Sequence, residues 1–432
     1  MDYILDSGLP ILLKVSNVGI LEYSFENAEP TAEVVLRRGP EGVGLYSTGS
    51  SPRIDEYPLG AWVVGESSTS VCHCCFDAVK SKGPLVRGKQ RADCPGITFC
   101  SDWCLASSKS ILDDAGALLT ALAASSIDGD GDRATITIQQ LALVILSRAK
   151  NNASARLALL DMIAHSHTKS PTPPHVVAAA AEFAASLQKG GLADIAATVS
   201  LEQLLNILAF NTHSIPFIGL PPRTLLVVFL PTLSHLNHSC VPNAVLTRSV
   251  TRSDRDTLRV SLHTLRKLKP GEQICVSYLS TLAGGKAERA ALLSTQFATC
   301  FCVRCSVDSN NENLTALDIH RKSLLALHKA LSSKDHLSIF RESCKIMTCL
   351  KAMGIGLSAL PEIEMLLSAA VSLISALKGG QSLAPQDVKE GLCWVRHAVD
   401  ALTKLWQGDA CFDYLAGKFK AVEEELQRLQ RS

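Results

Sequence analysis

The sequence predicts an α+β protein built from several structural units. Residues 224–280 alternate apolar and polar side chains with a period of two, which is typical of strands. From residue 315 onward, apolar side chains recur every three or four positions, which is typical of helices. With 432 residues, the chain is longer than one hydrophobic core usually spans. We therefore expect strand-rich and helix-rich parts in separate segments.

Composition argues against several classes of protein. The formal net charge is +1 and 47% of the residues are hydrophobic, with no run of lysine and arginine, so nucleic-acid binding is not expected. The N-terminus lacks a basic segment and is interrupted by Asp6 and Pro10, so a secretory signal is not expected. The most apolar runs are shorter than the roughly 20 residues that a membrane-spanning helix needs.

Each segment has its own pattern. Residues 1–70 read as strands and turns, including the strand AEVVLRR and the glycine-rich GPEGVGLYSTG. Residues 105–210 read as helices broken by SPTPPH, because proline cannot donate in a helix ladder. Ser200 is expected to cap the helix VSLEQLLNILAFN. NAVLTRSV and TLRVSLH predict a β-hairpin with Leu258, Val260 and Leu262 on one face, and KPGEQICVSYL predicts a turn and a strand.

The C-terminal segment is expected to be a series of helices. Pro361 stands at a predicted helix start and Gly379 at its end. Apolar residues from Phe412 to Leu429 step by three and four along one face.

Ten of the fifteen cysteines fall in two clusters, which favours zinc over disulfides when no secretory signal is present. In CFCVRC, Cys300, Cys302 and Cys305 place three thiols in one turn, and zinc needs four ligands. Cys240 of LNHSCVPN is the best candidate for the fourth. One alternative is a catalytic Cys240–His238 pair, but the two residues of such a pair are normally distant in sequence. A second alternative is that these cysteines bind no metal. The remaining cysteines, Cys275, Cys344, Cys349, Cys393 and Cys411, are expected to be buried apolar residues.

LNHSCVPN, then LKPGEQICVSYL, then CFCVRC resemble the C-terminal half of a SET domain, with its knotted loop and its post-SET zinc turn. VCHCC and CPGITFCSDWC resemble a MYND zinc finger, with matches at Cys72, Cys75, Cys94, Cys100 and Cys104. The resemblance implies one zinc held by Cys72, Cys75, Cys100 and Cys104, or a metal-free remnant of the finger. The second MYND zinc site is expected to be lost, because Arg91 stands at one ligand position and no His-x3-Cys follows Cys104. His73 and Cys74 are expected to be bystanders.

A SET domain split by a MYND finger and followed by helices resembles the SET- and MYND-domain (SMYD-like) family of protein-lysine methyltransferases. The resemblance divides the chain into 1–70 (N-terminal part of the SET domain), 71–104 (degenerate MYND-like finger), 105–205 (helical insert), 206–282 (C-terminal part of the SET core), 283–308 (post-SET zinc turn) and 309–432 (helical, TPR-like domain).

The resemblance implies an S-adenosylmethionine-dependent protein-lysine N-methyltransferase that acts on histone or non-histone proteins, with two structural zinc sites. Tyr278 matches the tyrosine at the transfer site and would orient the amine or the methyl group. The residues expected to contact the cofactor are Gly42, Val43, Gly44, Asn211, Ser234, Asn237, His238 and Tyr278. His238 would make its contact largely through backbone groups.

Some positions depart from the family pattern. Val43 replaces a frequent polar residue, Ala298 a post-SET aromatic residue, and His213 a preferred aromatic residue. The alternative is therefore a weak or inactive scaffold that binds proteins through the finger remnant and the helical tail. In either case we expect a monomer with protein partners, in the cytoplasm or the nucleus, and no binding to nucleic acid or membranes.

Overall fold

The fold is taken from a computed structural model. It describes residues 11–15, 21–24, 34–39, 42–49, 54–64, 71–76, 90–125, 133–165, 174–188, 191–216, 224–251, 257–279, 284–294, 300–306, 314–353, 360–380, 384–406 and 410–431. The chain divides into two compact units. The first comprises residues 1–48, 54–235 and 248–261, and the second comprises residues 49–53, 236–247 and 262–432.

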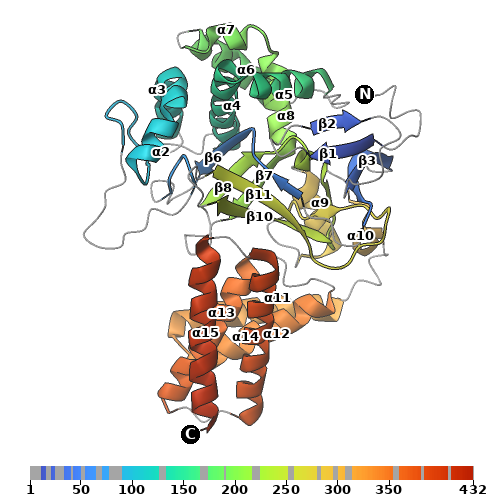
Figure 1. Cartoon of the computed structure of the whole chain (residues 1–432). Coiled ribbons are helices and arrows are strands. Elements are labelled where there is room, and N and C mark those ends of the chain that lie inside the picture. The colour runs from blue at the N-terminus through green and yellow to red at the C-terminus, as the bar shows by residue number, and fades with distance from the viewer. Residues whose placement is uncertain are drawn as a thin grey trace. The chain divides into compact units, whose positions relative to one another are not determined.

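The N-terminal strands of the first unit form a four-stranded sheet in the order β2-β1-β3-β4 (Figure 1). Its strands are β1 (Ile11–Val15), β2 (Leu21–Ser24), β3 (Val34–Gly39) and β4 (Gly42–Ser47). Val34, Val35 and Leu36 of β3 are buried, which explains why AEVVLRR forms a strand. The antiparallel β3–β4 register sets Gly44 opposite Arg37.

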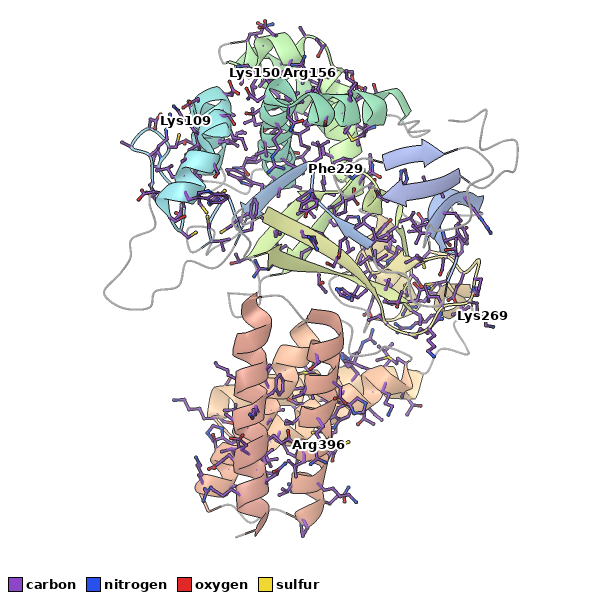
Figure 2. All side chains as sticks on the ribbon, in the orientation of Figure 1. Lys109, Lys150, Arg156, Phe229, Lys269 and Arg396 are labelled. Carbon is purple, nitrogen blue, oxygen red and sulfur yellow. The ribbon has the colours of Figure 1, made fainter. Side chains whose placement is uncertain are left out.

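A three-stranded antiparallel sheet in the order β6-β8-β7 lies at the core of the first unit. It consists of β6 (Gly60–Val64), β7 (Thr212–Pro216) and β8 (Leu225–Phe229). The run LLVVF in β8 is buried almost throughout, and Figure 2 labels Phe229, which is 1% exposed. Helix α4 (Arg133–Asn151) packs on β6, and a Cβ at Gly60 would lie 2.5 Å from Ile145 Cγ1. Only glycine permits this close approach.

Helices of the first unit fill the stretch between the cysteine turn and β7 (Figure 1). They are α2 (Asp102–Ser107), α3 (Lys109–Ser125), α4 (Arg133–Asn151), α5 (Ala153–His165), α6 (Pro174–Leu187), α7 (Ala193–Ala196) and α8 (Leu201–Asn211). The predicted break at SPTPPH is confirmed, because α5 ends at His165 and α6 begins at Pro174. The predicted cap of α8 is confirmed too, since the Ser200 hydroxyl accepts from Gln203 N–H.

The predicted hairpin is present as β10 (Ala244–Thr251) and β11 (Thr257–Thr264), in a sheet ordered β10-β11-β5 with β5 (Ile54–Glu56). Leu258, Val260 and Leu262 are buried as expected. Ser261 is buried as well, and its hydroxyl donates to Asp55 (2.5 Å). The predicted strand in KPGEQICVSYL is only β12 (Cys275–Val276), which pairs in parallel with β9 (Asn237–His238).

The tail of the second unit consists of helices that pack on one another in series (Figure 1). They are α11 (Leu314–Ser333), α12 (His336–Ala352), α13 (Leu360–Lys378), α14 (Pro385–Trp406) and α15 (Ala410–Arg431). Pro361 is the second residue of α13 and Gly379 directly follows its last residue, as predicted. Phe419, Val422 and Leu426 of the predicted stripe are buried, and the side chains of Phe412, Leu415 and Leu429 lie outside the described residues.

Two further expectations concern the whole chain. Cys275, Cys344 and Cys349 are buried as predicted, but Cys393 is exposed on α14, so that prediction was wrong for Cys393. The pattern of this amphipathic helix places Cys393 outside its apolar stripe. The Cys411 side chain lies outside the described residues. Among the residues described, no helix is both long enough and apolar enough to span a bilayer.

Candidate metal centres and catalytic segment

The first cysteine cluster brings together the four predicted ligands. The sulfurs of Cys72, Cys75, Cys100 and Cys104 lie within 4.8 Å of one another. Cys75 Sγ is 3.6 Å from Cys100 Sγ, which is 3.5 Å from Cys104 Sγ. Four thiolates about 2.3 Å from a tetrahedral zinc are about 3.8 Å apart, so the spacing fits this ion. His73 and Cys74 do not belong to the group, as expected.

Local structure explains this arrangement. Phe76 N–H donates to Cys72 O (2.8 Å), and Phe76 adopts a left-handed conformation (φ 57°), which closes the first turn. The Ser101 hydroxyl accepts from Cys104 N–H (3.1 Å), which starts α2 at the last ligand. Burial raises the pKa of Cys104 to about 11, with a further contribution from the nearby Cys72. A divalent cation would offset the repulsion between thiolates held this close.

The second MYND zinc position is occupied by other interactions. Arg91, at the lost ligand position, forms an ion pair with Asp93 and another with Asp113 of α3 (2.5 Å each). Cys94 is buried away from the four-sulfur group, against Gly116, where an added Cβ would lie 2.5 Å from its sulfur. These contacts agree with the expected loss of the second site.

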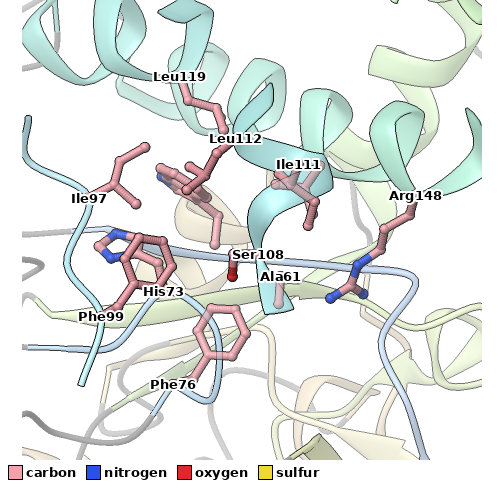
Figure 3. Close-up of a pocket in the computed structure, with 12 residues that line it drawn as sticks. Ala61, His73, Phe76, Ile97, Phe99, Ser108, Ile111, Leu112, Leu119 and Arg148 are labelled. Atoms are coloured by element: carbon pink, nitrogen blue, oxygen red, sulfur yellow. The ribbon is translucent and has the colours of Figure 1, made fainter. Parts of the chain in front are cut away.

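A small cavity of about 20 Å³ lies beside this finger, with room for about one water (Figure 3). His73, Ser108 and Arg148 line it among apolar side chains. His73 Nδ1 accepts from Thr98 N–H (3.2 Å), and burial lowers the pKa of His73 to about 4. The Arg148 guanidinium donates to Pro58 O (2.9 Å). The cavity is far too small for S-adenosylmethionine.

The second cluster unites Cys240 with the CFCVRC turn, as the sequence predicted. The sulfurs of Cys240, Cys300, Cys302 and Cys305 lie within 4.8 Å of one another. Cys240 Sγ is 3.9 Å from Cys300 Sγ and 3.5 Å from Cys305 Sγ, which again fits tetrahedral zinc. Hydrogen bonds with Cys300 and Cys302 raise the pKa of Cys240, so without a metal its thiol keeps its proton. The nucleophile in cysteine catalysis is the thiolate, so a thiol that keeps its proton and lies among three other cysteine sulfurs is unsuited to that role.

Asn243 fixes the loop that carries Cys240. Its Oδ1 accepts from Cys275 N–H (2.8 Å) and its Nδ2 donates to Gln273 O (2.8 Å). The Asn243 Nδ2 also donates to Glu272, whose pKa is lowered to about 2, chiefly by its hydrogen bonds with Arg266. The Asn243 side chain therefore adds two hydrogen bonds to backbone groups of residues 273–275, beside the backbone bond from Asn243 N–H to Cys275 O (3.2 Å).

Three predicted site residues lie together in this second unit. The Tyr278 hydroxyl donates to Leu236 O (2.6 Å), directly before Asn237 of β9. Tyr278 N–H donates to His238 Nδ1 (2.9 Å), and the two rings are 5.3 Å apart. The imidazole of His238 faces Cys240, and the residue as a whole is 6% exposed, so this side chain is occupied by contacts within the protein.

The other predicted cofactor residues lie in the first unit around η2 (Leu233–His235). β4, with Gly42, Val43 and Gly44, packs against η2. Ser234 lies in η2 and donates its hydroxyl to Pro231 O (2.9 Å). Asn211, at the end of α8, donates to Ile207 O (2.8 Å).

The positions that depart from the family pattern are only partly described. His213, two residues beyond Asn211, is 2.9 Å from Leu233 O through its Nε2. The side chain of Val43 and the whole of Ala298 lie outside the described residues.

Comparison with known proteins identifies the segment that holds these residues. The SET domain family model matches residues 209–279. The segment that matches the SET domain model contains Asn211, Ser234, Asn237, His238, Cys240 and Tyr278. The predicted α+β class with a SET domain, two cysteine-rich groups and a helical tail is thereby confirmed.

Several curated relatives match about a fifth of this chain. Histone-lysine N-methyltransferase ATXR2 of Arabidopsis thaliana is 36% identical over 83 residues, covering 19% of this chain and 17% of that protein. A SET and MYND domain-containing protein of Dictyostelium discoideum is 29% identical over 85 residues, 20% of each chain. Human N-lysine methyltransferase SMYD2 is 27% identical over 82 residues, 19% of this chain and 17% of that protein. The match thus spans about a fifth of each relative.

Sequence reasoning missed the arginines that support the site. Arg289 is fully buried and donates to Cys305 Sγ (3.7 Å). Arg248 of β10 is 1% exposed and donates to Phe76 O in the first cysteine turn. A single arginine in an otherwise ordinary strand or helix carries no motif, so no sequence signal marks either residue.

Proposed function

We propose that this SET-domain chain is an S-adenosylmethionine-dependent protein-lysine N-methyltransferase. The observation that carries the proposal is the fixed Tyr278 hydroxyl, which donates to Leu236 O directly before Asn237 and His238. A hydroxyl whose proton is committed to a carbonyl presents its oxygen lone pairs as acceptors. Such an oxygen can orient an amine N–H or a polarised methyl group.

The residues carry out positioning rather than proton abstraction. S-adenosylmethionine, when bound, supplies a methyl group on a sulfonium leaving group. Tyr278 would hold the lysine amine in line with that methyl group, and holding reactants in line is a large part of the rate enhancement in such displacements. The cysteine clusters take no part in the chemistry, and their zinc ions would be structural.

Several of the predicted residues suit a bound S-adenosylmethionine. Asn211 donates through Nδ2 to Ile207 O (2.8 Å), and its Oδ1 would accept hydrogen bonds from the ribose hydroxyls. Gly44 has no side chain to obstruct a ligand beside β4. In the sequence, only His235 and Leu236 separate Ser234 from Asn237, so these two cofactor residues belong to one short segment.

The names of the relatives support protein lysines as the substrate class. We further propose that the finger remnant and the helical tail bind protein partners, and that the protein acts as a monomer in the cytoplasm or the nucleus.

The test is methyl transfer from radiolabelled S-adenosylmethionine to a pool of histones and cell proteins, together with calorimetric cofactor binding. Tyr278→Phe should lower transfer by about 100-fold or more, because it removes the orienting oxygen, while cofactor binding persists. Tyr57→Phe is the matched control. The Tyr57 hydroxyl accepts a hydrogen bond from Arg259 Nη2 (3.0 Å), and Tyr57 is 38% exposed. Full transfer by Tyr278→Phe would show that Tyr278 is not the orienting residue.

Calorimetry decides between the enzyme and the scaffold. Saturable binding that is lost in Asn237→Ala supports a cofactor site at the NHSC loop. If folded, zinc-loaded protein does not bind millimolar cofactor, the methyltransferase proposal fails and the scaffold takes its place.

A further inference from the structure

Two side chains that are not ligands reach the sulfurs of the second cysteine cluster. His238 Nε2 lies 3.3 Å from Cys240 Sγ, and Arg289 Nη2 lies 3.7 Å from Cys305 Sγ. Both residues are buried, at 6% and 0% exposure. Buried polar groups at such distances are hydrogen-bonded rather than merely adjacent.

The proton on His238 can be placed from its partners. A backbone N–H can only donate, so His238 Nδ1, which lies 2.9 Å from Tyr278 N, must be an acceptor. The ring proton of the neutral imidazole is therefore on Nε2, which faces Cys240 Sγ. His238 thus donates to a predicted zinc ligand and at the same time holds the peptide of Tyr278.

Arg289 contacts a different sulfur of the same cluster. It lies in α9 (Lys286–Ser294), and its guanidinium donates to Gly284 O as well as to Cys305 Sγ. Burying a cation is costly unless an anion lies close by. Four thiolates around one Zn²⁺ carry a net charge of −2, so a zinc-loaded cluster would place negative charge beside the buried Arg289.

We propose that His238 and Arg289 are hydrogen-bond donors to the thiolates of the Cys240 zinc site, and that His238 thereby links zinc binding to the position of Tyr278. The inference rests on the zinc assignment made above. Donors of this kind weaken the competition of protons for the sulfur and orient the ligand. Removing one typically lowers metal affinity about 10–100-fold.

The experiment measures zinc affinity by competition with a chelating dye, using full-length protein loaded with zinc. His238→Phe and Arg289→Met should each weaken one zinc equivalent by about 10–100-fold. The equivalent held by the Cys72 cluster should not change, which makes it an internal reference. Cys240→Ser identifies which equivalent belongs to which cluster.

Two variants serve as controls. His238→Gln should retain most of the affinity, because its amide can both accept from Tyr278 N–H and donate to Cys240. The second control is Arg304→Met. Like Arg289, Arg304 donates to Gly284 O (3.3 Å), but the sulfur that its Nη2 contacts is Met353 Sδ (3.8 Å) and not a cysteine of the cluster. This variant should therefore keep a zinc affinity near that of the wild type.

A second readout tests the link to Tyr278 independently of activity. Deuterium exchange of the peptide that contains Tyr278 should accelerate in His238→Phe at saturating zinc, because the acceptor of that N–H is gone. It should accelerate in the wild type when zinc is removed, because Cys240 no longer fixes the imidazole. Arg289→Met at saturating zinc should leave this exchange unchanged.

Each alternative result has a definite meaning. Three results would overturn the inference while leaving the zinc proposal intact. The first is unchanged zinc affinity in His238→Phe and Arg289→Met. The others are an equal loss of affinity at both zinc equivalents, and a loss in Arg304→Met as large as that in Arg289→Met. Absence of zinc from the Cys240 cluster of the wild type would overturn both. If Arg289→Met does not fold, Arg289→Ala takes its place, since it also removes the donor, and unchanged affinity there would refute the role of Arg289.

Discussion

The Glu56 carboxyl group offers a test of how burial sets stability in the first unit. Glu56 is 3% exposed and accepts hydrogen bonds from Thr232 N–H (2.8 Å) and Leu233 N–H (3.0 Å), at the start of η2. Burial raises its pKa from 4.5 to about 7, although the backbone hydrogen bonds act in the opposite direction. The perturbation is Glu56→Gln, which keeps the size of the side chain and removes its titration.

The sign follows from proton binding. Because the pKa is higher in the folded state, the folded protein binds more protons than the unfolded chain between pH 4.5 and about 7. The stability that the protonated Glu56 contributes is fully present below pH 4.5 and is lost as the pH rises through about 7. At about 1.4 kcal/mol per pKa unit, the change is about 3 kcal/mol at most, and about 2.5 kcal/mol between about pH 5 and pH 8.

The assay is urea unfolding, followed by tryptophan fluorescence, of the zinc-loaded wild type and Glu56→Gln at several pH values between about 5 and 8. The free energy of unfolding of the wild type, relative to the variant, should fall across this range. Any mismatch between the glutamine NH2 group and a backbone N–H adds a constant offset and no slope. A difference that does not depend on pH, or one that grows with pH, would refute the reasoning.

Three further predictions concern packing and polar contacts. Asn243→Ala should lower the free energy of unfolding by about 2–4 kcal/mol, because it leaves Gln273 O and Cys275 N–H without their side-chain partner. Urea unfolding measures this change, and a loss below about 0.5 kcal/mol would contradict the prediction. Gly116→Ala should destabilise by about 1–3 kcal/mol, because the methyl group would lie 2.5 Å from Cys94 Sγ. Gly417→Ala, where nothing lies within 4 Å, is its control in the same melting experiment and should not destabilise. Arg91→Met breaks only exposed ion pairs, so metal analysis should find the zinc content unchanged, and a lost zinc would show that Arg91 supports the finger.

Local sequence patterns predicted much of the fold. The Ser200 cap, the break at SPTPPH and the β10–β11 hairpin each depend on a few neighbouring residues, and all three were confirmed. Predictions failed where distant partners intervene. Ser261 lies on the predicted polar face of β11 but is buried because Asp55 accepts from its hydroxyl. The strand at KPGEQICVSYL is shorter than predicted, because side chains such as Asn243 take over its hydrogen bonding.

The candidate site divides in the same way. The spacing of CFCVRC required a fourth ligand from elsewhere, and Cys240 was the residue the motif offered. That the four sulfurs meet is visible only in the structure. The sequence also suggested that His238 and Tyr278 belong to one site, but the tautomer of His238 and the acceptor of the Tyr278 hydroxyl follow from contacts across 40 residues or more.

By itself, the sequence determined the types of secondary structure, the cysteine groups and the SET domain, because periodicity, capping and ligand spacing are properties of adjacent residues. Only the tertiary structure decided which buried charges surround those groups. Arg289 against Cys305, Arg248 against Phe76 and Glu56 against η2 join residues that are remote in sequence. The physical reason is that burying a charged group is tolerable only where the fold supplies a matching partner, and that partner is chosen by packing rather than by sequence distance.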